Sequence, residues 1–275
     1  MPTEIAPSIF TTDHQVADGK NAIIFGSRRA LAIDTGTYPE EGQEMVDFIR
    51  AQGREPDLLV LTHGHGDHVL GSAPFKGAEV IAHDLCAAEM RRLLPDLAGR
   101  KNISFEDLAA QIVWPTITFN DELTVNLGDK TVWLFPTPGH SQDGISVYVR
   151  EDRLLIAGDS VVTSIIPAIG NGDSRALQAS LARLITLDIE IMVPGHGDVV
   201  HGREQVQDCL AWPIAYLGQV RAAVQDALAR GVAPDAVVEL VDYDKFVADR
   251  LPKDRHNMPN RHRDSVGKIV QEALQ

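Results

Sequence analysis

The chain of 275 residues is 44% hydrophobic and carries a formal net charge of -14. Such a composition can bury a large core, and the acidic balance argues against nucleic acids and anionic membrane surfaces as partners. The two cysteines, Cys86 and Cys209, lie far apart and predict free thiols rather than a disulfide framework. Because no basic segment precedes an apolar run at the start, and no stretch has the length of a membrane span, we expect a soluble, cytoplasmic protein.

The first part of the chain alternates between predicted strands and helices. Residues 21–36 contain two apolar runs around a Gly-Ser-Arg-Arg turn, which predicts a β-hairpin. Apolar residues at helical spacing predict one helix over residues 40–53 and another over residues 85–94. The continuous apolar runs of residues 57–63 and 78–84 are typical of strands that are buried on both faces.

The middle of the chain repeats this order. A less regular stretch, residues 95–120, is expected to form a helical insertion. Hairpins are predicted at residues 122–140 and 144–160, followed by a helix whose apolar stripe spans residues 177–185 and by a strand in residues 190–197. Two halves with the same order predict two βα layers packed face to face, with loops from both halves meeting at one edge.

Residues 203–275 predict a helical extension. Apolar residues from Val206 to Leu228 trace one stripe, and Pro213 within it is predicted to kink or split the helix. Gly231 is expected to end this helix, and a last amphipathic helix follows near the end of the chain. We therefore divide the chain into a main domain, residues 1–202, and a helical extension, residues 203–275, which is a candidate surface for a homodimer.

Four potential metal ligands follow the predicted strand 57–63 within six residues: His63, His65, Asp67 and His68. In an extended segment, side chains two residues apart point to the same side, so His63 and His65 can reach one ion. A turn into a helix at the following glycine would carry Asp67 and His68 to a second point nearby. Imidazole and carboxylate groups bind zinc and similar divalent ions, whereas the alternative is a solvated polar turn.

Three more candidates lie one small residue past an apolar run. These are His140 in TPGHS, Asp159 in IAGDS and His196 in VPGHG. A single histidine at a strand end is more often a hydrogen-bonded surface residue, but the same design at four strand ends favours one shared metal site. The other histidines fit no ligand position and are expected in ordinary structural or surface roles: His14, His83, His201, His256 and His262.

Taken in order, the segments AIDTG, THGHGDH, TPGH, AGDS and PGHG resemble the metallo-β-lactamase superfamily over about residues 20–200. In pattern they are nearest to the hydroxyacylglutathione hydrolase (glyoxalase II)-like and lactonase branches. The resemblance implies an α/β fold, a four-layer αβ/βα sandwich with its site at one edge of the two sheets. It also implies a first ion on His63, His65 and His140, a second on Asp67, His68 and His196, Asp159 as the bridge, and Asp34 bracing the ligand histidines. For Asp34, the alternative is a turn aspartate that caps a loop.

This ligand set predicts metal-assisted hydrolysis of a small-molecule substrate. The charge of two divalent ions exceeds that of two carboxylates, which favours a bridging hydroxide as the nucleophile. Asp67 and Asp159 are the candidates that orient the nucleophile or pass a proton. Zinc suits the ligands best, although iron or manganese also fits them.

We expect the substrate to be a small ester, thioester or lactone. The alternatives on the same fold are a metal-binding sensor, a mononuclear iron dioxygenase and a β-lactamase-like amide hydrolase. Arg255, Arg261 and Arg263 are candidates for binding a substrate carboxylate, or else surface charges. An apolar pocket wall, or else simple loop packing, is expected from Tyr38, Ile165, Ile166 and Ile169.

Overall fold

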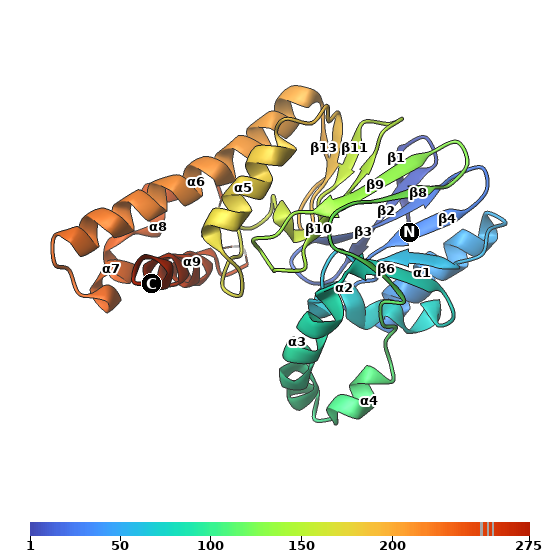
Figure 1. The fold of residues 1–275 in the computed structure, drawn as a ribbon, viewed down its shortest axis with the longest axis horizontal. Helices are drawn as coiled ribbons and strands as arrows, with labels where there is room; N and C mark the ends of the chain where they lie inside the picture. The colour runs from blue at the N-terminus through green and yellow to red at the C-terminus, as the bar shows by residue number, and fades with distance from the viewer. Residues whose placement is uncertain (248–249, 252, 255) are drawn as a thin grey trace.

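Two β-sheets lie face to face at the centre of the molecule, and helices cover the outer side of each (Figure 1). The computed structural model describes residues 1–247, 250–251, 253–254 and 256–275. The first sheet has the order β1 (Thr3–Ala6), β2 (Ile9–His14), β3 (Gly19–Phe25), β4 (Ala30–Ile33), β5 (Leu58–Val60), β6 (Glu79–His83) and β7 (Ile117–Phe119). The second has the order β13 (Val200–His201), β12 (Ile191–Val193), β11 (Leu154–Ile156), β10 (Ile145–Val149), β9 (Thr131–Pro136) and β8 (Leu123–Asn126).

The parallel strands lie inside the sheets, except for the edge strand β7. Strands β4, β5, β6 and β7 run parallel to one another, as do β11 and β12, whereas the remaining pairs are antiparallel. Every residue of β4, β5 and β11 is buried, as expected for strands covered on both faces. Their carboxyl ends therefore point to the same edge of the molecule, where loops from both sheets meet.

Three hydrophobic clusters fill the spaces between four layers. The central cluster joins the inner faces of the two sheets, with Leu31 and Val60 from one and Leu134 and Val147 from the other. A second cluster lies between the first sheet and the helices α1 (Pro39–Ala51) and α3 (Cys86–Lys101). A third lies between the second sheet and the helices α5 (Ser174–Leu184), α6 (Arg203–Ala229) and α9 (Met258–Ala273). This confirms the predicted αβ/βα sandwich with C-terminal helices.

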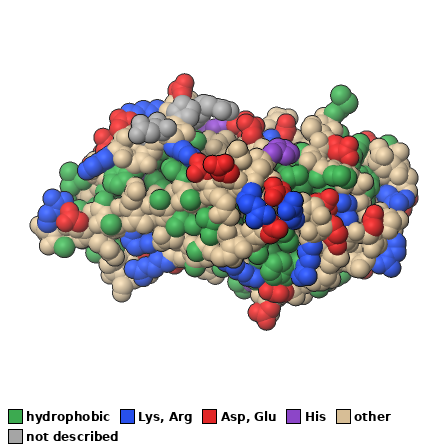
Figure 2. All heavy atoms as spheres, turned by 90° about the horizontal axis from the view of Figure 1, so that it is seen from above, with side chains coloured by type: hydrophobic (Ala, Val, Ile, Leu, Met, Phe, Trp, Pro, Cys, Tyr) green, Lys and Arg blue, Asp and Glu red, His purple; other side chains and the backbone are tan. Residues whose placement is uncertain are grey.

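The short helices are α2 (Gly66–Val69), α4 (Phe105–Ala109), α7 (Pro234–Leu240) and α8 (Tyr243–Phe246), with 3-10 turns at Leu70–Phe75 and Gly158–Ser160. Among the helices of the described residues, none is both long and apolar enough to cross a membrane. On the face seen in Figure 2, acidic side chains and lysines and arginines lie in scattered groups among apolar and other atoms.

Two expectations about the elements were met only in part. Pro213 does not split its helix, because α6 runs unbroken and Pro213 is buried within it. The apolar residues on both sides of Pro213, Leu210 and Leu217, pack into the same cluster, and this burial outweighs the loss of one backbone hydrogen bond. Residues 95–120 are not wholly helical, since they end in the edge strand β7. The division into domains at residue 202 stays a prediction.

Candidate metal centre

The loops after β4, β5, β9, β11 and β12 meet at one edge of the two sheets. Each carries one or more of the predicted site residues. Strand β5 ends at Val60, and the chain stays extended up to His65 (φ -73°, ψ 149°) before α2 begins at Gly66. This turn from strand to helix carries Asp67 and His68 away from His63 and His65, as the spacing predicted.

The structure brings all seven predicted ligands together in two adjoining groups. Within each group, one nitrogen or carboxylate oxygen per residue lies within 4.8 Å of the others. The first group consists of His63, His65, His140 and Asp159, and the second of Asp67, His68 and His196.

Asp159 lies between the two groups. Its Oδ2 is 3.3 Å from His140 Nε2 and 3.3 Å from His196 Nε2, while its Oδ1 is 3.2 Å from His68 Nε2. The carboxylate therefore faces imidazoles of both groups at once. Gly195 makes room for it, because a Cβ atom at that position would lie 2.0 Å from Asp159 Oδ1.

The Asp34 carboxylate orients the His68 ring of the second group. It accepts hydrogen bonds from the Thr62 backbone N–H (2.8 Å), the Thr62 hydroxyl (2.7 Å) and His68 Nδ1 (2.9 Å). Asp34 is buried, and its backbone adopts the left-handed conformation (φ 56°) just after β4. By holding Nδ1, Asp34 leaves His68 Nε2 directed at Asp159, which is the arrangement found behind metal-binding histidines.

Two other histidines of these groups are oriented by backbone carbonyls. His140 Nδ1 donates to the carbonyl oxygen of Ala168 (2.6 Å), and His196 Nδ1 donates to that of Val16 (3.1 Å). In both rings the Nε2 atom is left for the centre. One nitrogen of each ring is therefore tied to the surrounding chain, while the other converges on its group.

Unpaired buried atoms show that these residues fit metal ions. Four of the converging atoms are buried without a hydrogen-bond partner among the described residues: His63 Nε2, His65 Nε2, His68 Nε2 and Asp159 Oδ1. Buried polar atoms are rarely left unpaired, because the loss of hydration is costly. A set of imidazole nitrogens and carboxylate oxygens around two points matches the ligands of divalent ions such as zinc, iron or manganese.

The two groups differ in their protonation. Burial, reinforced by neighbouring imidazoles, lowers the pKa of His63 well below its usual value and that of His65 to about 3. Burial alone would also lower the pKa of His68 and His196, but the carboxylates around them outweigh it. The pKa of His68 is therefore raised well above its usual value, and that of His196 is raised to about 10.

The pKa values of the two carboxylates, Asp159 and Asp67, are lowered. Burial alone would raise the pKa of Asp159, but the imidazoles of His196, His68 and His140 hold it well below its usual value. The pKa of Asp67 is lowered in the same way, by its hydrogen bond to His196 and by the nearby His68. Both carboxylates are therefore ionised at neutral pH, as a metal ligand must be.

Two residues that border the centre were missed by the sequence reasoning. Asp143 is buried, and its Oδ2 accepts a hydrogen bond from the Gly64 backbone N–H (2.7 Å), which fixes the loop between His63 and His65. His14 is buried with its ring edge-on to those of His68 and His196. Burial, followed by the effect of those two imidazoles, lowers the pKa of His14 to about 3. The only sequence signal for Asp143 is its place just after the TPGH segment.

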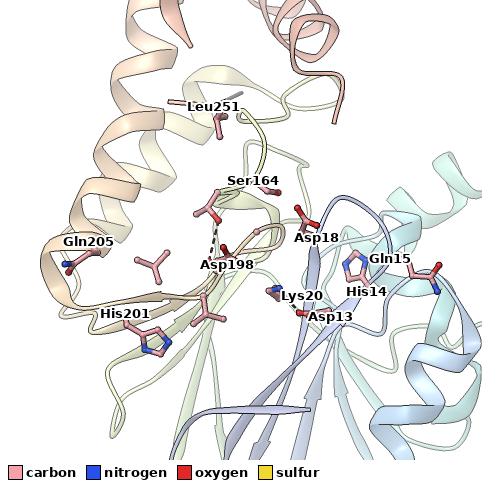
Figure 3. Close-up of a pocket in the computed structure, with 14 residues that line it drawn as sticks. Asp13, His14, Gln15, Asp18, Lys20, Ser164, Asp198, His201, Gln205 and Leu251 are labelled. Atoms are coloured by element: carbon pink, nitrogen blue, oxygen red, sulfur yellow. Dashed lines mark hydrogen bonds and ion pairs between the residues drawn. The ribbon is translucent and has the colours of Figure 1, made fainter. Parts of the chain in front are cut away.

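Two cavities adjoin the centre. One, of about 200 Å³, is lined by His65 and His140 together with Ile169, Asn171 and Arg261. The other, of about 710 Å³, lies between the β2–β3 hairpin and the loop after His196 and is more polar (Figure 3). It is lined by His14 and by charged or polar side chains that include Asp13, Lys20, Ser164 and His201.

The structure separates the three candidate arginines. Arg261, on α9, lines the cavity beside His65 and His140. Arg263 instead pairs with Glu239 on the outer surface, so it is not directed at the centre. Arg255 lies outside the described residues.

The predicted apolar wall is only partly present. Ile169 lines the smaller cavity, whereas Ile165 and Ile166 are buried in the cluster beneath the second sheet. Tyr38 is 40% exposed, with the Lys101 ammonium over its ring, and it lines neither of these cavities.

A profile of the metallo-beta-lactamase superfamily matches residues 17–196 of this chain. The chain belongs to this superfamily. The matched residues cover most strands of both sheets and end at His196, so they include every residue of the two groups.

Curated relatives within the superfamily have different activities in their names. The chain is 24% identical over 261 residues to a linear primary-alkylsulfatase of Pseudomonas sp., covering 81% of the chain and 49% of the relative. It is 27% identical to an atrochrysone carboxyl ACP thioesterase of Passalora fulva, covering 66% and 49%. The chain thus spans about half the length of these relatives. Neither name belongs to the hydroxyacylglutathione hydrolase or lactonase branch that the sequence pattern suggested.

Solved structures of other proteins share the fold. A metallo-beta-lactamase family protein from Thermus thermophilus matches with a TM-score of 0.70 at 17% identity, over 98% of this chain and 94% of that chain. The sec-alkyl sulfatase PisA1 matches with a TM-score of 0.72 at 15% identity, over 99% of this chain and 50% of that chain. At these identities the likeness establishes the architecture, including the C-terminal helices.

Proposed function

We propose that this protein is a hydrolase that uses two divalent metal ions to cleave a small ester, thioester or lactone. The observation that carries the proposal is the position of Asp159, whose two oxygens face imidazoles of both groups at 3.2–3.3 Å. A carboxylate in this position can hold two ions side by side, and zinc is the ion that suits the ligands best. When bound, the ions supply an activated water and polarise the oxygen of the scissile group.

The residues of the chain provide position, charge and a place for a proton. Asp34, and the carbonyls of Ala168 and Val16, hold the ligand rings so that the converging nitrogens cannot turn away. Asp67 is the most open carboxylate of the centre, with 25% of its side chain exposed, and is the proposed proton acceptor during hydrolysis. Asp159, buried between the imidazoles, is the proposed bridging ligand.

The smaller cavity is the proposed substrate site. It opens beside His65 and His140 and combines an apolar side chain, Ile169, with the guanidinium of Arg261 and the amide of Asn171. This lining suits a substrate with an alkyl or acyl part and an anionic group. Two relatives named as a thioesterase and an alkylsulfatase support cleavage of an ester-type bond, although the bond that this chain cleaves is a proposal.

A panel of substrates on metal-loaded protein tests this function. We would remove all metal, reload with zinc, iron or manganese, and measure the ion content. The loaded protein would then be assayed against a glutathione thioester, an acyl-homoserine lactone, a primary alkyl sulfate and a cephalosporin. Turnover of the thioester or lactone that depends on two bound ions supports the proposal. Turnover of the cephalosporin alone would favour an amide hydrolase, and two bound ions with no turnover would favour the metal-binding sensor.

A further inference from the structure

Residues 161–173 form a segment that lies directly against the loop of His140. The carbonyl oxygen of Ala168 in this segment accepts the hydrogen bond from His140 Nδ1 (2.6 Å). Gly172 approaches Gly139 so closely that a Cβ atom at position 172 would lie 1.8 Å from the Gly139 carbonyl oxygen. The position of the 161–173 segment therefore determines where the His140 ring is held.

The 161–173 segment is in turn held by the C-terminal helix α9. The hydroxyl of Ser265 on α9 donates a hydrogen bond to the carbonyl oxygen of Pro167 (3.2 Å). Ser265 is 2% exposed, so this bond is shielded from solvent. Pro167 directly precedes Ala168 in the chain. Two consecutive carbonyls of the segment are thus bound by different parts of the molecule, one by α9 and the next by His140.

Apolar packing and a second polar contact support the same connection. Ile166 and Ile169 of the segment are fully buried, and they share a hydrophobic cluster with Ile269 of α9. At the end of the segment, the Glu272 carboxylate of α9 accepts hydrogen bonds from the Ser174 backbone N–H (2.9 Å) and from the Ser174 hydroxyl. The segment is therefore tied to α9 both in its middle and at its end.

The smaller cavity is built from the same parts. Its wall consists of His65 and His140, of residues 168–171 of the segment, and of three residues of α9: Arg261, Asp264 and Ser265. A shift of the segment relative to α9 would therefore move the His140 ring and change the shape of the cavity together.

We propose that Ser265 is a positioning residue of the first metal group, which acts on the His140 ring through the adjoining carbonyls of Pro167 and Ala168. The proposal rests on the proposed function, since it requires that the first group holds an ion. Without the hydroxyl, the buried Pro167 carbonyl loses its partner, and the segment that holds His140 Nδ1 is less firmly fixed. The C-terminal helices are then part of the support of the metal centre.

Metal titration of Ser265 variants tests the proposal. Metal-free protein would be titrated with Co²⁺ against a competing chelator, with the visible absorption recorded at each step. The His140→Ala protein identifies the absorption band of the ion in the first group, because it loses a predicted ligand of that group alone. In Ser265→Ala we expect this ion to bind about threefold to tenfold more weakly, less than when the direct partner of a ligand is removed. The ion in the second group should bind as in the natural protein.

Three further variants show whether the effect passes through His140. Ser265→Thr keeps the hydroxyl and should restore the natural affinity. In a His140→Ala background the ring is already gone, so Ser265→Ala should have little further effect. Tyr243→Phe is the matched control, because its hydroxyl donates to the Leu251 carbonyl (2.7 Å) within the C-terminal helical region. It removes a comparable bond and should lower the thermal midpoint, but leave the affinity for both ions unchanged.

The outcomes separate this proposal from the proposed function. If the natural protein binds only one ion, the dinuclear hydrolase is contradicted, and the effect of Ser265→Ala on that ion still decides the role of Ser265. If it binds two and Ser265→Ala binds both with unchanged affinity and absorption, the role of Ser265 is overturned and the dinuclear centre stands. Equal weakening of both ions would also overturn it. Circular dichroism establishes that each variant is folded, and Ser265→Cys, with its weakly donating thiol, replaces an alanine variant that is not.

Discussion

The two groups of the metal centre are built from similar residues but stand in different electrostatic surroundings. In the first group the three imidazole rings are 4.5–5.0 Å apart, and burial keeps the pKa of His63 and His65 low. In the second, His68 and His196 are 5.7 Å apart, and neighbouring carboxylates raise the pKa of both. His63 and His65 therefore offer neutral imidazoles to an ion, whereas His68 and His196 must first lose protons.

This difference follows from the number of carboxylates on each side. His68 lies between Asp34 and Asp159, and His196 lies between Asp67 and Asp159. Each carboxylate that orients an imidazole also stabilises its protonated form when no ion is present. The same contacts that shape the second group thus make its affinity depend on pH. We expect the first ion to bind more tightly. The affinity for the second ion should depend more strongly on pH.

The largest effect is expected from Asp159→Asn, because Asp159 is the side chain that the two groups share. The amide cannot supply the same charge to two ions, so the variant should bind one ion or none. Turnover of any substrate identified for the protein should fall on the order of a thousandfold or more. Elemental analysis and steady-state kinetics measure both effects. Asp226→Asn is the control, because its carboxylate is 68% exposed and pairs with Arg230 on the surface of α6. Unchanged metal content in the Asp159 variant would remove the dinuclear centre.

That these residues come together could be predicted from the sequence because most of them follow apolar strands. His63, Asp159 and His196 each come directly after a buried run, and this local pattern places them at a common edge. The supporting contacts join residues far apart in the chain, which no local pattern records. Gly64 bonds to Asp143 over 79 residues, and His196 bonds to the Val16 carbonyl over 180.

The same limit explains why His14 and two of the arginines could not be assigned from the sequence. His14 lies in a segment without a metal-binding motif, and only the pairing of β2 with β3 brings it to the second group. Arg261 and Arg263 are two residues apart on α9 and cannot be told apart by charge, yet one lines the cavity and the other pairs with Glu239. The direction in which a helix presents its side chains is decided by packing, which the apolar stripe of α9 indicates only roughly.

A pH series distinguishes the two groups without any mutation. The pKa of His196 is raised from 6.5 to about 10 in the metal-free protein, so a second ion must displace a proton over this range. The affinity for the second ion should rise about tenfold per pH unit for each proton displaced. It should level off when the pH approaches the raised pKa of His196. The first group, with neutral His63 and His65, should show a much weaker dependence. Titration with Co²⁺ in several buffers, with the released protons counted, measures both.

The raised pKa of His196 also determines whether the metal-free protein becomes more or less stable as the pH rises. A raised pKa means that folding favours the protonated imidazole, so the stabilisation from His196 is fully present below pH 6.5. It is lost as the pH rises toward 10. The thermal midpoint of the metal-free protein should therefore fall over this interval, whereas the metal-loaded protein should change less. Equal pH dependence of the two ions, or a rising midpoint, would contradict the electrostatic difference between the groups.

Removal of the Asp34 carboxylate should weaken the second group without emptying the first. Asp34→Asn keeps the size of the side chain but loses the charge that holds Thr62 and His68 Nδ1. The second ion should bind about tenfold to a hundredfold more weakly, as when the partner of a metal-binding histidine is removed. The raised pKa of His68 should also fall, because Asp34 is one of its causes. Chelator competition measures the affinity of each ion, and an equal loss at both would show that Asp34 supports the whole edge instead.

The smallest effect is expected at the proposed substrate cavity beside the first group. Arg261 lines the cavity beside His65 and His140, and its Nε is held by the His256 carbonyl at 2.8 Å, which leaves the terminal nitrogens for a ligand. Arg261→Gln should raise the KM of an anionic substrate about fivefold to tenfold, which corresponds to the loss of one charged hydrogen bond. It should leave kcat and the content of both ions nearly unchanged. Arg263→Gln is the matched control, since Arg263 pairs with Glu239 away from the cavity and should not alter KM. A neutral substrate of the same shape should be unaffected by either change, because the guanidinium acts on the charge of the substrate and not on the ligands of the ions.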